Sequence, residues 1–265
     1  MIEFSNVSMS YSSQAPLALS DVTFRIEDGE FVFIIGHSGS GKSTTIKLLS
    51  CEERITSGDI IIDGINISTM KRSLVPYLRR NIGMVFQDFR LIQSKTVREN
   101  VAFAMEILGE SPRKIRRQVS MVLSTVGLRS RENALPNELS GGEQQRVGIA
   151  RAMVNNPSII LADEPTGNLD PANSESIMAL LDEINRNGTT VIVCTHDREM
   201  VNRMQKRVIE ISSGKLIRDA KFAKYVDNDD YLMEVDQTAG EDLPITVDSE
   251  PDDASAQAYN IYYSH

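Results

Sequence analysis

The 265-residue sequence has no tryptophan, only two cysteines and no hydrophobic run of membrane-spanning length. A helix that crosses a bilayer needs about 20 mostly apolar residues, whereas the most hydrophobic segment, FVFIIG at 31–36, is far shorter. Cys51 and Cys194 lack the spacing of metal ligands or of a disulfide framework, so both are predicted to be small buried side chains. Glu3 and the early alternating pattern exclude a cleavable secretory signal, and we therefore expect a cytoplasmic chain.

Basic residues are absent from the end of the chain. From Tyr225 to His265 there are eleven Asp or Glu and no Lys or Arg, which leaves 28 basic and 26 acidic residues in 1–224. The net charge of −9 is therefore a property of this tail. Its sparse hydrophobic residues and uniform charge predict a disordered extension, with a short docking segment around YNIYYSH as the alternative.

The remaining 224 residues alternate between strand and helix patterns. The first 30 residues alternate as antiparallel strands do, and IIIDGINI and RVIEISSGKLIRD predict hairpins around Asp63-Gly64 and Ser213-Gly214. FVFIIG, SIILADE and TTVIVCTHD are continuous apolar runs typical of strands buried in a parallel sheet. Between about 88 and 155 the pattern is mostly helical. The sequence thus predicts an α/β core interrupted by a helical insert.

A phosphate-binding loop follows the first buried strand. Gly36, Gly41, Lys42 and Ser43 match the pattern G-x-x-x-x-G-K-[ST] between a strand and a helix, the context that this motif requires. Glycines let backbone amides face phosphate oxygens, the lysine reaches the terminal phosphates, and the Ser43 hydroxyl can ligate Mg²⁺. His37 and Ser38 occupy variable positions, and His37 is given no chemical role. The candidate nucleotide-binding loop is Gly36, His37, Ser38, Gly39, Ser40, Gly41, Lys42, Ser43 and Thr44.

Two carboxylates end the apolar run SIILADE. Such groups at the mouth of a buried strand are costly unless they meet a cation or a phosphate site. Asp163 is predicted to hold Mg²⁺, directly or through water. If the strand continues, Glu164 points to the opposite side, which suits a carboxylate that polarises the attacking water.

The segment LSGGE at 139–143 offers a second cluster of free amides at a helix start. Ser140 and Glu143 fit the S-x-x-E capping box, which leaves Gly141 and Gly142 unexplained. Because the chain has one phosphate-binding loop, it binds one nucleotide. A second copy could bring Ser140, Gly141 and Gly142 over the γ-phosphate, and two copies would do so reciprocally.

These motifs and their order resemble the ATP-binding cassette (ABC) ATPase family over about residues 1–220, with LSGGE similar to its signature. The resemblance implies that Tyr11 stacks on adenine and that Gln87, in GMVFQDFRL, contacts Mg²⁺ and the attacking water. It also implies that Asp170, in GNLD, reaches across a dimer interface and that His196 contacts the γ-phosphate. The implied catalytic set is Glu164, His196 and Gln87, and the implied metal ligands are Ser43, Gln87 and Asp163.

The same resemblance implies an α/β P-loop NTPase with a RecA-like core, an antiparallel β subdomain and an α-helical signature subdomain at about 88–155. Residues 1–224 would form this domain and 225–265 the acidic tail. The expected activity is hydrolysis of ATP to ADP and phosphate, with ATP and Mg²⁺ as cofactors and a homodimer in the ATP-bound state. No nucleic-acid partner is expected.

Longer matches, including QDFRL and NRMQKRVIEI, resemble the cell-division branch of the family. That branch implies a permease-like integral membrane partner, a place on the cytoplasmic face of the membrane and control of cell-wall hydrolysis. The alternative is the ATPase of a lipoprotein-releasing or macrolide-type exporter, whose members share GNLD. A soluble translation or DNA-repair factor of this family would need two cassettes in one chain or a long coiled-coil insert, and neither fits in 265 residues. A purely structural interaction module need not hydrolyse ATP, but in this sequence every catalytic position that the resemblance implies is filled.

Overall fold

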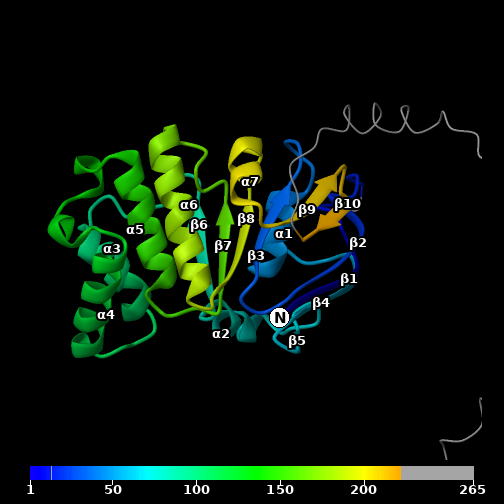
Figure 1. The fold of residues 1–265 in the computed structure, drawn as a ribbon. Helices are drawn as coiled ribbons and strands as arrows, with labels where there is room; N and C mark the ends of the chain where they lie inside the picture. The colour runs from blue at the N-terminus through cyan, green and yellow to red at the C-terminus, as the bar shows by residue number, and fades with distance from the viewer. Residues whose placement is uncertain (13, 222–265) are drawn as a thin grey trace, which may run out of the picture. The chain divides into compact units, whose positions relative to one another are not determined.

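Two β-sheets organise the part of the chain that the computed structural model describes, residues 1–12 and 14–221 (Figure 1). The smaller sheet is antiparallel and has the strand order β2-β1-β4-β5. Its strands alternate buried and exposed side chains, because one face of the sheet packs on the core. They are β1 (Ile2–Met9), β2 (Leu19–Ile26), β4 (Ser57–Ile62) and β5 (Ile65–Asn66).

The larger sheet has the order β10-β9-β3-β8-β7-β6 and is parallel except for its β9-β10 edge. Its central strands β3 and β8 are buried along their whole length, as continuous apolar runs require. All the parallel strands end at the same edge of the sheet. The strands are β3 (Phe31–Ile35), β6 (Ile82–Phe86), β7 (Ile159–Asp163), β8 (Thr190–Cys194), β9 (Arg207–Ser212) and β10 (Lys215–Ala220).

Seven α-helices complete the described ranges, and two hydrophobic cores hold them. One core packs α1 between the two sheets, and the other joins the larger sheet to α3–α6. Helices α3, α4 and α5 lie together beyond β6, beside α6 (Figure 1). The helices are α1 (Lys42–Leu49), α2 (Val75–Arg79), α3 (Val97–Glu106), α4 (Pro112–Thr125), α5 (Gly141–Met153), α6 (Pro171–Arg186) and α7 (Arg198–Met204).

The local predictions from the sequence are confirmed in most places. Both hairpins form, and both residues of each predicted turn have positive φ, as a two-residue hairpin turn of this kind requires. Cys194 is fully buried, but the prediction for Cys51 is wrong, since this residue turns the chain after α1 with φ 55° and stays half-buried. Among the described residues no helix is long and apolar enough to span a bilayer.

The predicted domain limits were 1–224 and 225–265. Helices α3, α4 and α5 occur within the segment 88–155 that was predicted as the helical subdomain. The predicted acidic tail, 225–265, lies outside the described residues, and so does its predicted disorder.

Candidate active site

The loop between β3 and α1 is shaped by glycine. Gly36, Gly39 and Gly41 have φ of 148°, 76° and 115°, a region that other residues rarely adopt. Gly41 is also the N-cap of α1, and a Cβ there would lie 2.7 Å from the carbonyl oxygen of Ala18. No side chain caps α1, so its first amides remain available to a ligand, and the helix dipole favours an anion there.

Lys42 brings a positive charge without a direct ion-pair partner to this loop. The side chain is buried, and its Nζ donates hydrogen bonds to the carbonyl oxygens of Gly36 at 2.8 Å and His37 at 3.1 Å. These acceptors are neutral, and no carboxylate lies within ion-pair distance among the residues the model describes. The ammonium is therefore held in place by neutral carbonyls rather than by a direct ion pair, as a group that binds phosphate should be.

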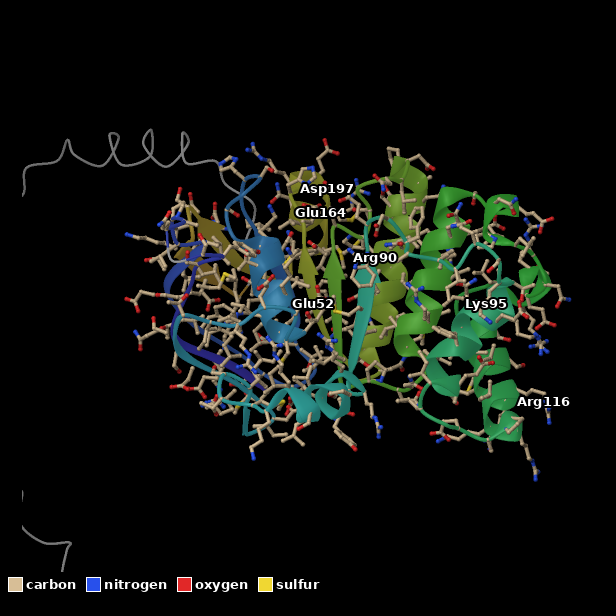
Figure 2. The ribbon with its side chains drawn as sticks, turned by 180° about the vertical axis from the view of Figure 1, so that it is seen from behind. Glu52, Arg90, Lys95, Arg116, Glu164 and Asp197 are labelled. Carbon is tan, nitrogen blue, oxygen red and sulfur yellow. The ribbon has the colours of Figure 1, made fainter. Side chains whose placement is uncertain are left out.

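The predicted catalytic residues converge on one cleft of about 600 Å³, a size typical of ligand sites. Figure 2 shows Glu164 and Asp197 close together at this end of the molecule. Arg198, the first residue of α7, also lines the cleft and was missed by sequence reasoning; its position two residues after His196 was the available signal. The cleft is lined by Gly36, His37, Ser38, Gly39, Lys42, Ser43, Gln87, Glu164, His196 and Arg198.

The end of β7 places Asp163 against α1. The Ser43 hydroxyl donates to Asp163 Oδ1 at 3.1 Å. Burial raises the pKa of Asp163, the charge of Glu164 raises it further, and the Ser43 hydrogen bond opposes both effects. A partly buried carboxylate beside a hydroxyl is an oxygen donor set that suits Mg²⁺, which uses few protein ligands when phosphates supply the others.

Glu164 does not continue the strand, so the expected strand alternation is wrong at this residue. Strand β7 ends at Asp163, and Glu164 takes a left-handed φ of 47° while its amide donates to the Cys194 carbonyl oxygen at 2.9 Å. This turn directs the carboxylate to His196, with Oε1 2.8 Å from Nδ1. The His196 side chain is 68% exposed and the Glu164 side chain 16%. The pair thus stands at the cleft with Nε2 of His196 remaining for a further contact.

Gln87 lines the cleft immediately after β6. Its side-chain amide donates to Asn168 Oδ1 at 3.3 Å, and Asn168 Nδ2 donates to the Gln87 carbonyl oxygen at 3.0 Å. Asn168 belongs to the GNLD segment but was not singled out from the sequence. The pairing links the loop after β6 to the loop that precedes α6.

Tyr11 lies against the first turn of α1. Its hydroxyl is 3.0 Å from Thr44 Oγ1, and the ammonium of Lys47 lies 5.4 Å from the ring centroid. The residue is 51% exposed. An exposed aromatic ring next to the phosphate-binding loop leaves a face on which a base can stack.

The signature segment lies apart from this cleft. Ser140 is the N-cap of α5, and it forms the predicted capping box with Glu143, through hydrogen bonds of 3.2 and 2.8 Å. A Cβ on Gly142 would collide with the Asn173 side chain, so that glycine lets α5 approach α6. Asp170 caps α6, and hydrogen bonds from Asn173 lower its pKa. Within the described ranges, Ser140, Gly141, Gly142 and Asp170 are not among the residues that line the cleft.

Comparison with known proteins identifies the family to which this fold belongs. The model of the family described as ABC transporter matches residues 19–167. The chain belongs to the ABC transporter ATPase family. The cell division ATP-binding protein FtsE of Mycobacterium tuberculosis is 54% identical over 225 residues, covering 85% of this chain and 98% of that protein. FtsE of Escherichia coli is 50% identical over 216 residues, covering 82% of this chain and 97% of that protein.

A solved structure agrees with the fold. The dimeric post-hydrolysis structure of the ATP-binding cassette MJ0796, bound to ADP and Pi, is 39% identical with a TM-score of 0.76 and covers 85% of this chain and all of that one. The predicted α/β ABC ATPase fold is confirmed. This FtsE-like ABC ATPase hydrolyses ATP, and ATP or ADP is its nucleotide.

The partly buried carboxylate of Asp163 makes this ATPase less stable without its ligands. Because the folded-state pKa of Asp163 is raised, stability is lost as the pH rises from the unfolded value of about 3.9 through the folded value. In the absence of nucleotide and divalent ions, Asp163→Asn is expected to raise the free energy of unfolding at pH 7 by up to about 2 kcal/mol. Urea unfolding measures this change, and the advantage should shrink on acidification. A variant of equal or lower stability at pH 7 would contradict the stated cost.

Proposed function

We propose that this chain is the ATP-hydrolysing subunit of an FtsE-type machine, which dimerises around two ATP molecules and drives an FtsX-like membrane protein to regulate cell-wall hydrolysis during cell division. The chain would act as a peripheral protein on the cytoplasmic face of the membrane. The observation that carries the chemistry is the Glu164–His196 pair in one cleft with Lys42 and Ser43. The extent of the similarity to FtsE supports the cell-division role.

The cleft accounts for ATP binding. The free amides at the start of α1 and the ammonium of Lys42 bind the β- and γ-phosphates, and the ring of Tyr11 stacks on adenine. Ser43, Asp163 and Gln87 would hold Mg²⁺. When bound, the ion supplies positive charge that neutralises the phosphate oxygens.

Hydrolysis needs a base and charge stabilisation at the γ-phosphate. Glu164 orients water for in-line attack, and its bond to Nδ1 of His196 leaves Nε2 of that ring for the γ-phosphate. The low exposure of Glu164 beside an exposed His196 suits these roles, because the carboxylate is shielded while the imidazole reaches the cleft mouth.

The far side of the γ-phosphate would be closed by a second copy. Ser140 is exposed at the start of α5 and lies outside the cleft of its own chain. In a head-to-tail dimer, each Ser140 with Gly141 and Gly142 would cover the nucleotide of the other copy, and Asp170 would lie at the interface.

The membrane partner would dock beside β6. A groove of about 420 Å³ runs there, lined by apolar residues of β6 and by Arg79, Arg80, Arg90 and Arg151. Figure 2 shows Arg90 beside this edge strand. Arg151, on α5, donates to the carbonyl oxygens of Phe89 at 2.9 Å and Arg90 at 2.6 Å. A partner segment in this groove would thus contact the loop after Gln87 and, through it, the signature helix.

Replacement of the base tests the hydrolytic mechanism. Glu164→Gln is expected to retain ATP binding and to lower turnover by about 10² to 10⁴, because the water loses its base. Phosphate release and light scattering with ATP measure turnover and the trapped dimer. Glu106→Gln, an exposed carboxylate on α3, is the matched control and should be normal. Unchanged turnover in Glu164→Gln would remove this residue from the mechanism.

A mixture of two inactive variants tests the shared site. Lys42→Ala impairs the phosphate-binding loop and Ser140→Arg blocks the signature, so each alone should lose turnover. In a mixed dimer, one site contains both changes and the other contains neither, so mixing should restore turnover. Steady-state phosphate release measures this recovery. Absence of recovery would contradict reciprocal closure.

Capture from cell membranes tests the partner. The Glu164→Gln form with ATP is expected to retain an FtsX-like permease together with division proteins. Arg90→Glu in the groove should lower that recovery, whereas Arg116→Glu, on α4 and far from the groove (Figure 2), should not. Recovery of a substrate-exporting permease would keep the ATPase chemistry and replace the cell-division role by that of an exporter.

A further inference from the structure

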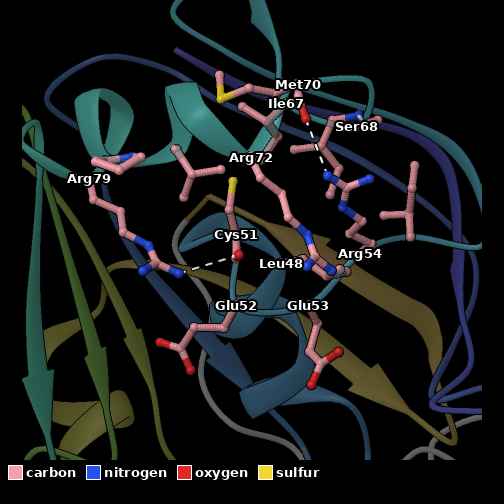
Figure 3. Close-up of a pocket in the computed structure, with 14 residues that line it drawn as sticks. Leu48, Cys51, Glu52, Glu53, Arg54, Ile67, Ser68, Met70, Arg72 and Arg79 are labelled. Atoms are coloured by element: carbon pink, nitrogen blue, oxygen red, sulfur yellow. Dashed lines mark hydrogen bonds between the residues drawn. The ribbon is translucent and has the colours of Figure 1, made fainter.

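A second cavity of about 440 Å³ lies at the opposite end of α1 from the ATP cleft. Its walls come from the end of α1, the loop 51–55, the strand β4 and the segment 67–79 (Figure 3). Neither the proposed hydrolysis nor the shared dimer site uses this cavity. It shares only Glu52 and Arg79 with the groove beside β6.

Three arginines line the cavity without a carboxylate partner. Arg54, Arg72 and Arg79 form no ion pair with any residue in the described part of the chain, although many other arginines there do. Two of them are held by neutral acceptors instead. Arg79 Nε donates to the Ser50 carbonyl oxygen at 2.8 Å and Arg54 Nη2 donates to the Met70 carbonyl oxygen at 3.4 Å. Since a guanidinium has five N–H donors, most remain for a ligand.

Two glutamates also line the cavity, but they do not neutralise it. Glu52 Oε1 accepts from the Ser50 hydroxyl at 3.2 Å. In Figure 3 the carboxylates of Glu52 and Glu53 extend away from Ser68 and Met70, whereas the Arg54 guanidinium is directed to the Met70 carbonyl oxygen. With three cationic and two anionic side chains the cavity keeps a net charge of +1.

Apart from Ser68, the rest of the lining is apolar or weakly polar. Leu48, Ile60 and Ile67 are buried there, with Val75 and Pro76 beside them. Cys51 is also in the lining, where burial raises the pKa of its thiol and the charges of Arg79 and Arg54 oppose that rise. A ligand would therefore meet exposed positive charge and an apolar wall together.

We propose that this cavity, bounded by Arg54, Arg72 and Arg79, binds a phosphate ester that carries an apolar group. Guanidinium groups recognise phosphate oxygens through paired hydrogen bonds, and the neutral carbonyls that hold Arg54 and Arg79 leave their charge available for such a ligand. The shared chemistry fits either the headgroup of an anionic phospholipid or a soluble phosphate ester.

The thiol of Cys51 provides a local reporter, because Cys194 is fully buried. The full chain is kept with saturating ADP and Mg²⁺, so that the phosphate-binding loop is occupied, and alkylation of Cys51 is followed by mass spectrometry. The probes are phosphatidylcholine vesicles with and without phosphatidylglycerol, and soluble dihexanoyl phosphatidylglycerol. The vesicles that contain phosphatidylglycerol should slow alkylation, with or without an effect of the soluble probe, whereas phosphatidylcholine alone should not.

The variant Arg54→Gln/Arg72→Gln should weaken this protection about tenfold or more, since two charge-assisted contacts are lost. Arg113→Gln/Arg117→Gln removes the same charge from exposed positions on α4 and should protect as the unaltered chain does. Protection by vesicles alone assigns a membrane headgroup, and protection by the soluble probe as well assigns a free ester. No protection by either probe, or equal weakening in both variant pairs, would overturn the proposal. This result is independent of ATP turnover and of the membrane partner.

Discussion

The passage of the chain from β3 into α1 is the constraint on which the rest of the structure depends. The loop must leave a buried parallel strand, turn back and start a helix while its amides face one point. Its glycines have backbone angles that other residues rarely adopt, and a Cβ on Gly36 would collide with the carbonyl oxygen of Ile211 in β9. The loop is thus fixed by the sheet behind it. Hence the free amides of α1 and the ammonium of Lys42 are set before ATP binds.

The other charged residues of the active site are placed around this loop by the ends of the neighbouring strands. The parallel strands all end at one edge, so Asp163 at the end of β7 and His196 after β8 come together although they are distant in sequence. This placement destabilises the ionised form of Asp163, since burial and the charge of the nearby Glu164 both disfavour it. The site is therefore strained electrostatically without its ligands, which is the condition under which cation and phosphate binding are most favourable.

Sequence alone was sufficient where one local rule decides the outcome. The glycine loop, the two hairpin turns and the Ser140 capping box follow from short-range geometry, and each formed as predicted. It failed where a turn depends on distant contacts. Glu164 was expected to follow strand alternation, but its amide bonds the Cys194 carbonyl of the adjacent strand and the residue turns left-handed. Asn168 was missed for the same reason, because only the folded chain brings it to Gln87. Arg198 was missed although its position two residues after His196 was a local signal.

Gly141 and Gly142, the two glycines of the signature segment, differ in how tightly they are packed within the chain. A Cβ on Gly142 would collide with the Asn173 side chain on α6, so packing within the chain favours glycine there. A Cβ on Gly141 would be less crowded, at 3.3 Å from Leu169 Cδ2 and 3.9 Å from the nearest other atoms. Packing therefore restricts Gly142 more strongly than Gly141. In the proposed dimer a phosphate group would approach the amides at the start of α5, and a bare backbone at Gly141 would let the anion come close.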